Sequence, residues 1–242
     1  MKHTLKYFFS AYCLFFSVVL FAQNSSVNEQ TRQKPKDTIK KTQRYGLRIG
    51  ADLSKLTRSF FDKNYKGLEL VGDYRFTKNN YLAVELGNEN KTTEENRVNF
   101  TTKGSYFKVG IDHNFYENWL DMENMIHLGF RYSVSSFSQE LNTYKIYDTS
   151  TYFPTVPTVV AGTQFDGLSA QWIEVVAGMK AKLFNNFYAG LSVRMNYLVS
   201  QKEPDNFANL YIPGFNRTYD GKFGAGWNYT ITYMIPIYKS KK

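Results

Sequence analysis

The chain has 242 residues, a formal net charge of +9, 19 tyrosines, 20 phenylalanines and a single cysteine. Cys13 lies in an apolar segment near the start, so disulfides and thiol chemistry are excluded for the remainder of the chain. The excess of positive charge is concentrated at the two ends and the body between them is close to neutral, which argues against nucleic-acid binding.

The first 22 residues have the pattern of a secretory signal peptide. Lys2 and Lys6 precede an apolar run over residues 7–21, and Ala22 supplies a small residue at the cleavage point. A membrane-anchoring helix is the alternative, but the run is short for a span. Residues 23–43 are polar and basic and contain no aromatic side chain, which predicts a disordered periplasmic linker.

Eight later segments alternate apolar and polar side chains with period two, as expected for strands with two different faces. In the first, RYGLRIGADL, the polar face carries full charges and glycines instead of the small polar residues of a water-facing sheet. Each segment is about the length that crosses an apolar layer at a tilt. The predicted strands are 44–53, 67–76, 81–89, 105–115, 125–135, 172–183, 187–199 and 223–238.

The links between these segments alternate in length. TKNN and FNN are short and YENWLDMEN is modest, whereas the other four links have about 13, 15, 36 and 23 residues. Short periplasmic turns and long extracellular loops are typical of outer-membrane barrels. The predicted fold is therefore all-β, an eight-stranded antiparallel up-and-down transmembrane β-barrel over residues 44–238, with a basic periplasmic tail at 239–242. The predicted location is the outer membrane of a Gram-negative cell.

The lumen of an eight-stranded barrel is narrow enough for side chains to fill. Seven basic and six acidic residues and one histidine occupy the predicted inward face, which indicates a neutralised plug of ion pairs and disfavours a selective pore. These residues are Arg48, Asp52, Glu69, Asp73, Arg75, Glu85, Lys108, Asp112, His127, Arg131, Glu174, Lys180, Lys182 and Arg194.

Eight-stranded barrels also include enzymes, so a catalytic set has to be considered. Ser133 or Ser135 with His127 and Glu174 would have the residue types for nucleophilic catalysis. The simpler interpretation is that His127 belongs to the polar plug. The sequence contains no nucleophile-elbow, phosphate-loop or metal-ligand spacing. We therefore expect no catalytic residue, no metal and no cofactor.

The longest link, residues 136–171, is too rich in apolar and aromatic side chains for a solvated tether. Exposed aromatic anchors are characteristic of protein interfaces. We expect this link, together with residues 200–222, to dock onto extracellular partner proteins. The expected anchors are Tyr144, Ile146, Tyr147, Tyr152, Phe153, Phe165, Phe207, Tyr211 and Phe215.

Three stretches resemble an uncharacterised outer-membrane β-barrel family of Bacteroidota, a domain of unknown function. They are RYGLRIGADLSKLTRSFFDKNYKGLELVGDYRFTKNNYLAVELGNENKTTEE, FTTKGSYFKVGIDHN and YMIPIYK. The resemblance covers nearly all of the chain after the signal peptide and brings no catalytic motif. It also implies a likeness to the BamF-like subunit of the Bacteroidota β-barrel assembly machinery, a small barrel that sits beside the main barrel and carries surface lipoproteins.

This resemblance implies a non-enzymatic barrel that anchors an extracellular complex. The implied partners are outer-membrane lipid, extracellular or surface lipoproteins and a larger outer-membrane barrel, with no nucleic acid. A lipid-modifying or hydrolytic outer-membrane enzyme and a narrow pore remain as alternative functions.

Overall fold

The computed structural model describes residues 42–118, 123–146, 158–204, 208–217 and 221–241. Lys40–Lys242 form one compact unit, which is the barrel. The predicted signal peptide and nearly all of the predicted linker lie outside the described residues.

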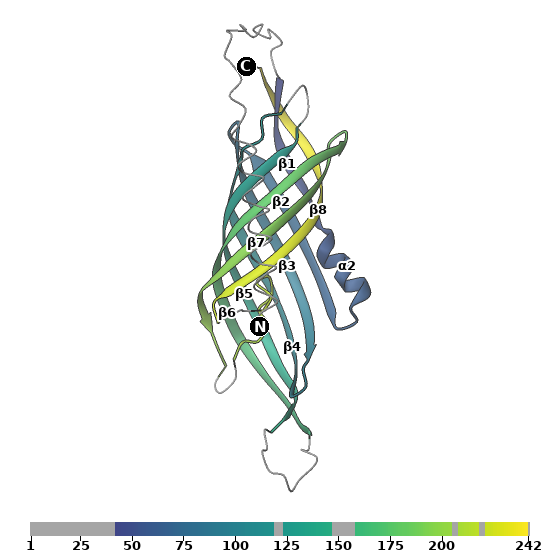
Figure 1. Ribbon diagram of the computed structural model, residues 1–242, viewed down its shortest axis with the longest axis vertical. Helices are drawn as coiled ribbons and strands as arrows, with labels where there is room; N and C mark the ends of the chain where they lie inside the picture. The colour runs from purple at the N-terminus through teal and green to yellow at the C-terminus, as the bar shows by residue number, and fades with distance from the viewer. Residues whose placement is uncertain (1–41, 119–122, 147–157, 205–207, 218–220, 242) are drawn as a thin grey trace, which may run out of the picture. The chain divides into compact units, whose positions relative to one another are not determined.

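Eight strands form a closed barrel in chain order, and every neighbouring pair is antiparallel (Figure 1). The predicted fold class is confirmed. The strands are β1 (Thr42–Asp52), β2 (Tyr65–Arg75), β3 (Asn80–Glu94), β4 (Val98–Asn114), β5 (Met125–Lys145), β6 (Thr158–Phe184), β7 (Phe187–Lys202) and β8 (Phe223–Lys241). Helix α2 (Leu53–Phe61) follows β1 and lies outside the ring of strands (Figure 1).

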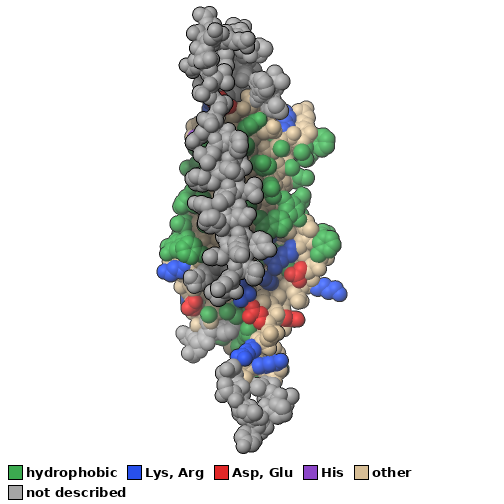
Figure 2. All heavy atoms as spheres, in the orientation of Figure 1, with side chains coloured by type: hydrophobic (Ala, Val, Ile, Leu, Met, Phe, Trp, Pro, Cys, Tyr) green, Lys and Arg blue, Asp and Glu red, His purple; other side chains and the backbone are tan. Residues whose placement is uncertain are grey.

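The two faces of the wall differ as the alternation predicts. On β1, Arg48 and Asp52 are buried inside, whereas Ile49 is half exposed on the outside. Outward apolar side chains surround the barrel, and we call them the apolar belt; Figure 2 shows part of it in green, with charged side chains gathered toward one end. The belt includes Leu68, Leu70, Leu82, Leu86, Phe107, Ile111, Leu128, Phe130, Val175, Met179, Leu191, Val193, Met195, Ile231 and Ile235.

The two ends of the barrel are distinguished by their turns. Residues 76–79 and 185–186 make the short turns that we predicted, and Asn186 adopts a left-handed φ of 66° that asparagine tolerates. Thr42 pairs with Lys241 at the same end. We call this the periplasmic end, because short turns face the periplasm in such barrels, and the opposite end extracellular.

The chain's two ends extend the ladder further than predicted. Thr42 and Gln43, which we assigned to the linker, pair with Lys241 and Ser240. Most of the predicted basic tail, residues 239–241, is therefore the last part of β8. The backbone groups of this segment gain hydrogen-bond partners on β1, so it continues the strand although its polar residues suggested a free tail.

On one side of the barrel the strands run well beyond their predicted extracellular ends. β3 and β4 leave only residues 95–97 between them, and β5 and β6 leave only residues 146–157. The expected loops of about 15 and 36 residues are therefore wrong. Polar outward residues such as Ser136 continue the ladder into water, and register shifts beside Phe137 and Leu141 interrupt the alternation that sequence reading relies on.

On the other side β1 stops early. β1 pairs with β2 only from Leu47 to Ala51, so no strand joins Tyr65–Glu69 of β2 to Phe223–Tyr229 of β8. We call this interval the lateral gap, and α2 packs against both of its flanking strands. Asp52 begins the helix, because its carboxylate accepts a hydrogen bond from the Ser54 backbone N–H at 2.7 Å.

Candidate functional site

The centre of the lumen is held by charged side chains from facing strands. Arg194 on β7 donates two hydrogen bonds to Glu85 on β3, at 2.6 and 3.1 Å, and a third to Glu174 on β6 at 3.2 Å. Lys108 on β4 donates to the other oxygen of Glu174 at 2.8 Å. Buried charges are tolerated only when they are paired and hydrogen-bonded. Here Glu174 lies within ion-pair distance of two cations and Glu85 of three, which are Arg194, Arg131 and Lys108.

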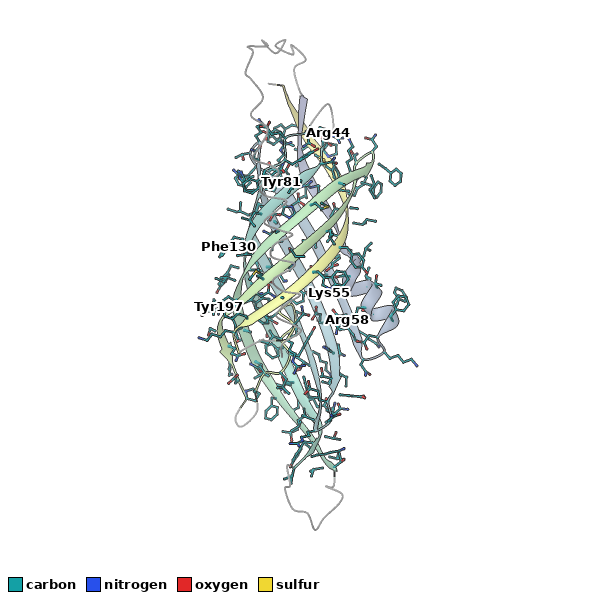
Figure 3. The ribbon with its side chains drawn as sticks, in the orientation of Figure 1. Arg44, Lys55, Arg58, Tyr81, Phe130 and Tyr197 are labelled. Carbon is teal, nitrogen blue, oxygen red and sulfur yellow. The ribbon has the colours of Figure 1, made fainter. Side chains whose placement is uncertain are left out.

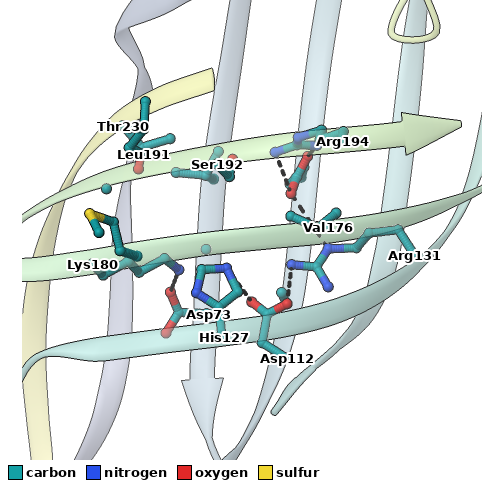
Figure 4. A pocket seen from close by; sticks show the side chains of 16 residues that line it. Asp73, Asp112, His127, Arg131, Val176, Lys180, Leu191, Ser192, Arg194 and Thr230 are labelled. Atoms are coloured by element: carbon teal, nitrogen blue, oxygen red, sulfur yellow. Dashed lines mark hydrogen bonds and ion pairs between the residues drawn. The ribbon is translucent and has the colours of Figure 1, made fainter. Parts of the chain in front are cut away.

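A second group of pairs lies towards the periplasmic end. The two carboxylate oxygens of Asp73 accept hydrogen bonds from Arg48 Nε and from Lys180 Nζ, each at 2.6 Å. Arg131 Nη2 lies 2.7 Å from Asp112 Oδ1, and His127 Nε2 lies 3.9 Å from Asp112 Oδ2 (Figure 4). We call the ten residues of these two groups the lumen network. They are Arg48, Asp73, Glu85, Lys108, Asp112, His127, Arg131, Glu174, Lys180 and Arg194.

The other four predicted plug residues serve elsewhere. Asp52 caps α2 and accepts a second hydrogen bond from Asn228. Glu69 accepts a hydrogen bond from the Tyr106 hydroxyl at 2.5 Å. At the periplasmic end, Arg75 donates to the carbonyl of Lys78 at 3.1 Å and Lys182 Nζ lies 3.5 Å from Glu123.

Little space remains within the lumen network. A cavity of about 30 Å³ is lined by Asp73, Glu85, His127, Arg131 and Lys180, among others (Figure 4). That volume holds about one or two water molecules. The inward-facing Gly87 makes room for a long neighbour, because a Cβ there would overlap the Tyr106 ring. The lumen at this level is a packed core.

Residues 208–217 close the extracellular mouth of the barrel, and we call them the mouth segment. Tyr211, Ile212 and Phe215 are fully buried, and the Phe215 ring packs edge-on against Trp172 with a centroid distance of 5.7 Å. Gly214, with a φ of 81°, makes the turn that lets this segment fold inward. Its carbonyl accepts a hydrogen bond from Lys108 at 3.2 Å, which joins the mouth segment to the lumen network.

The expected role of Tyr211 and Phe215 as exposed partner anchors is therefore wrong. Their apolar surface is used inside the barrel, because the chain between β7 and β8 is long enough to return into the mouth. Composition identifies such side chains as anchors but does not say whether the partner is another protein or the barrel itself. Phe207, a third anchor from this link, lies outside the described residues.

Glu89 on β3, which sequence reading missed, organises the mouth. It is fully buried and accepts hydrogen bonds from Lys55 on α2, from the Tyr211 hydroxyl at 2.5 Å and from the Gly214 N–H at 3.3 Å. Burial and the Glu89 carboxylate both raise the pKa of Tyr211 well above its usual range, so the phenol stays protonated and donates. Glu89 thus ties α2, β3 and the mouth segment together.

A further cluster that we did not predict lies at the periplasmic end. Glu123, in the link between β4 and β5, accepts hydrogen bonds from Arg44 Nε and from the Tyr188 hydroxyl, each at 2.6 Å. Burial acts to raise the pKa of Glu123, but the hydrogen bonds from Arg44 and Tyr188 outweigh it and lower the pKa to about 2. Glu123 stands in an irregular link, so no periodicity signals its inward direction.

The remaining predicted partner anchors lie on or near the β5–β6 hairpin. Ile146, just beyond the end of β5, is 60% exposed, whereas Phe165 on β6 packs against the buried cluster at the mouth. Tyr144 helps to line an open groove of about 630 Å³, which we call the hairpin groove. Its lining residues are Val98, Leu141, Tyr144, Val159, Val160, Ala161 and Thr163. Tyr147, Tyr152 and Phe153 lie outside the described residues.

The candidate catalytic residues are not arranged as a triad. His127 Nδ1 and Ser133 Oγ have no hydrogen-bond partner among the described residues, and Ser135 Oγ donates to the Ser105 carbonyl at 3.3 Å. Glu174 is occupied by Lys108, Arg194 and the indole N–H of Trp172 at 2.6 Å. Within the described ranges, no group of three or more His, Cys, Asp or Glu residues is placed to hold a metal ion.

Comparison with protein families matches residues 4–240 to the family described as Domain of unknown function (DUF6048). The chain belongs to this family. A search of curated proteins finds no match for this DUF6048 member.

Solved structures that resemble the DUF6048 chain include two outer-membrane proteins. Neisserial surface protein A (NspA) aligns with a TM-score of 0.43 at 9% identity, over 80% of this chain and 99% of NspA. Ail, the attachment invasion locus protein of Yersinia pestis, aligns with a TM-score of 0.39 at 13% identity, over 81% of this chain and all of Ail.

The assignment of this DUF6048 protein to the outer membrane follows from the strands and side chains of its barrel wall. The described part of the chain contains no helix of the length and apolarity required for a membrane span. A closed ring of strands satisfies its backbone groups internally, and an apolar belt around a polar interior is the arrangement of an outer-membrane barrel. The protein is an outer-membrane β-barrel.

Proposed function

We propose that this protein is a non-enzymatic anchor for an extracellular protein complex. We further propose that it acts as an accessory subunit of the β-barrel assembly machinery in the outer membrane of a Bacteroidota cell. The observation that carries the anchor role is the β5–β6 hairpin, which extends past the apolar belt and presents apolar side chains there.

The position of the hairpin groove supports a protein partner. Val160 is 79% exposed and Ile146 is 60% exposed, yet both lie beyond polar outward residues such as Ser136 and Ser169, where lipid tails do not reach. Apolar surface that faces water in a folded protein commonly marks an interaction site. The groove beside Tyr144 and Val159 provides a concave surface for an apolar anchor from a partner.

The packed interior supports an anchor over the two alternatives. The lumen network and the buried mouth segment leave a cavity of about 30 Å³, which is far too small for a solute path. Glu174 is bonded to Lys108 and Ser135 Oγ to the Ser105 carbonyl, and neither group is hydrogen-bonded to His127 among the described residues. A rigid barrel of this kind supplies a fixed platform for the hairpin.

The link to the assembly machinery rests on the resemblance of the sequence to the BamF-like subunit. The proposed partners are surface lipoproteins and a larger outer-membrane barrel, in a setting of outer-membrane lipid and without nucleic acid. Membership of a family of unknown function is compatible with this role and adds no partner by itself.

Shortening the hairpin tests the proposal. Thr143 and Val160 are register partners, so replacing residues 144–159 with Asn-Gly closes the two strands with a tight turn. We expect the shortened barrel to reach the outer membrane in the folded, heat-modifiable form. Its partners should be lost when it is purified at native abundance and the co-purifying proteins are identified by mass spectrometry.

Point variants separate the groove from the hairpin's length. Val160→Glu should reduce partner recovery, whereas Ser136→Glu, on the outward face below the groove, should not. Recovery of the full partner set with the shortened hairpin would refute the anchor role. Recovery of a stoichiometric complex without assembly-machinery components would refute that assignment alone.

A further inference from the structure

The lateral gap holds a groove that the proposed anchor role does not use. Its volume is about 420 Å³, and it runs between α2 on one side and β8 with the mouth segment on the other. Thr57 and Phe61 line it from the helix, Trp227 and Tyr229 from β8, and Tyr211 from the mouth segment. We call it the lateral groove. Because β1 ends at Asp52, this is the part of the wall where no strand separates the mouth from the outside.

The charged residues that line the lateral groove are all basic. They are Lys55 and Arg58 from α2 (Figure 3), Lys91 from β3 and Arg217 from the mouth segment. No aspartate or glutamate of the described chain lines it. Four cations around one groove repel one another unless an anion lies among them.

The anions that the protein provides do not balance this charge. Lys55 is paired with the buried Glu89. Arg58 lies 3.7 Å from Asp62 and Arg217 lies 3.3 Å from Glu95, but these pairs are exposed and such pairs contribute little.

Lys91 is the cation with the least compensation. It has no carboxylate within 4.0 Å among the described residues, and its ammonium lies 4.6 Å from the centre of the Tyr211 ring. A half-buried ammonium that rests on an aromatic face keeps its remaining donors for a ligand. Lys91 therefore supplies unpaired positive charge to the groove, and Arg58 and Arg217 add charge that their exposed pairs with Asp62 and Glu95 offset only weakly.

The outer side of the groove is aromatic and faces lipid. Phe60 and Phe61 at the end of α2 are each 86% exposed, and Trp227 is 63% exposed and stacks on Tyr229 at 5.6 Å. Exposed aromatic rings at this level mark the membrane interface, and a short helix that presents two phenylalanines outward lies in that interface. The groove thus has a cationic inner end and an apolar outer end at headgroup depth.

From this arrangement we propose that the lateral groove binds an outer-leaflet lipid by a phosphate group of its head. The phosphate lies among Arg58, Lys91 and Arg217, where guanidinium groups donate paired hydrogen bonds to its oxygens. An acyl chain leaves the groove past Phe61 and Trp227 into the bilayer. The site lies on the opposite side of the barrel from the hairpin groove, so lipid binding there does not depend on the proposed anchor role.

The full-length barrel in dodecylmaltoside micelles allows a direct test by native mass spectrometry. The probe is diphosphoryl lipid A, and the comparisons are dephosphorylated lipid A and inorganic phosphate. The test variant is Arg58→Gln/Lys91→Gln, which leaves the Lys55–Glu89 pair intact. The matched control is Lys66→Gln/Lys103→Gln, which removes two exposed lysines from extracellular parts of β2 and β4 that do not line the groove.

We expect the test variant to bind diphosphoryl lipid A at least tenfold more weakly than the unchanged protein, and the control variant to bind it within twofold. Dephosphorylated lipid A should bind weakly, and with equal affinity, to the unchanged protein and to the test variant. Equal binding of diphosphoryl lipid A by the test variant and the unchanged protein would overturn the proposal. So would competition by inorganic phosphate at the lipid's own concentration, since the site would then take free phosphate. Heat-modifiable migration of each variant establishes that its barrel is folded.

Discussion

The strands end differently on the two sides of this barrel at the extracellular end. From β3 to β6 the strands continue beyond the apolar belt as paired ladders and end in the β5–β6 hairpin. From β8 to β2 the wall stops short, because β1 ends at Asp52 and α2 covers the lateral gap. One side therefore projects a protein surface into water, while the other opens a groove toward lipid.

Both sides share the same lumen network and the same wall within the apolar belt, so they differ only beyond the belt. Within the belt every backbone N–H and C=O group must be hydrogen-bonded between strands and every buried charge must be paired. Strand length and residue type can therefore vary little there. Beyond the belt water satisfies the backbone, and strand length becomes free to change. The proposed functions are located where that freedom begins.

The largest expected effect comes from breaking the shared interior. Arg194→Met leaves Glu85 and Glu174 buried with fewer cations, and we expect the free energy of unfolding to fall by about 3–5 kcal/mol. Arg217→Met removes an exposed pair at the gap and should cost less than about 1 kcal/mol. Urea unfolding in lipid vesicles measures both, and equal losses would contradict the distinction between interior and rim.

A lysine scan sharpens the boundary of the apolar belt. Leu191→Lys places a charge in the middle of the lipid-facing wall and should lower the free energy of unfolding by about 2–4 kcal/mol. Ser136→Lys, on the outward face of the β5 extension, should change it by less than about 0.5 kcal/mol. The same unfolding measurement serves, and equal tolerance at the two positions would show that the outward faces or the end of the belt are misplaced.

Loosening α2 should affect one side only. Asp52→Ala removes the helix cap and one partner of Asn228, with an expected loss of about 1–2 kcal/mol. Hydrogen exchange followed by mass spectrometry should show faster exchange over residues 53–61 and unchanged exchange over β5. Faster exchange on both sides would mean that the gap and the hairpin are coupled.

The smallest effect concerns pH at the periplasmic end, which both sides share. The pKa of Glu123 is lowered from 4.5 to about 2 in the folded protein, so its stabilising contribution is complete above pH 4.5 and is lost as the pH falls toward 2. Partial exposure of the cluster reduces the expected loss to about 1 kcal/mol. Unfolding midpoints between pH 6 and pH 3 measure it, with Glu123→Gln as the control. An identical pH profile for the variant would assign the dependence to other groups.

Sequence by itself determined the strands, their faces and the content of the lumen. Period-two alternation is local, so Arg48, Asp73 and Arg194 could be placed inside without knowledge of their partners. Alternation also supported the charge-paired interior, since the lumen of eight strands is narrow enough for side chains to fill. The weaker points were strand ends, where outward polar residues replace apolar ones and bulges shift the register.

Helix α2 was within reach of sequence reading but was missed. Asp52 is a good helix cap, and Leu53, Leu56 and Phe60 recur at helical spacing. Period-two alternation places Asp52 and Leu53 in the first strand, and the short segment after them reads as part of the link to the second strand. A helix of this length gains most of its stability from packing against β2 and β8, which the local pattern does not contain.

Only the tertiary structure decided the extracellular end. Glu89 and Tyr211 are 122 residues apart in the chain, and the hydrogen bond between them is what turns an apparently exposed aromatic segment into part of the core. Lys91, Arg58 and Arg217 come from three different elements and form one cationic groove only because β1 stops at Asp52. Alternation assigns a residue to a face of its own strand, but which distant segment meets that face depends on the closure of the whole barrel.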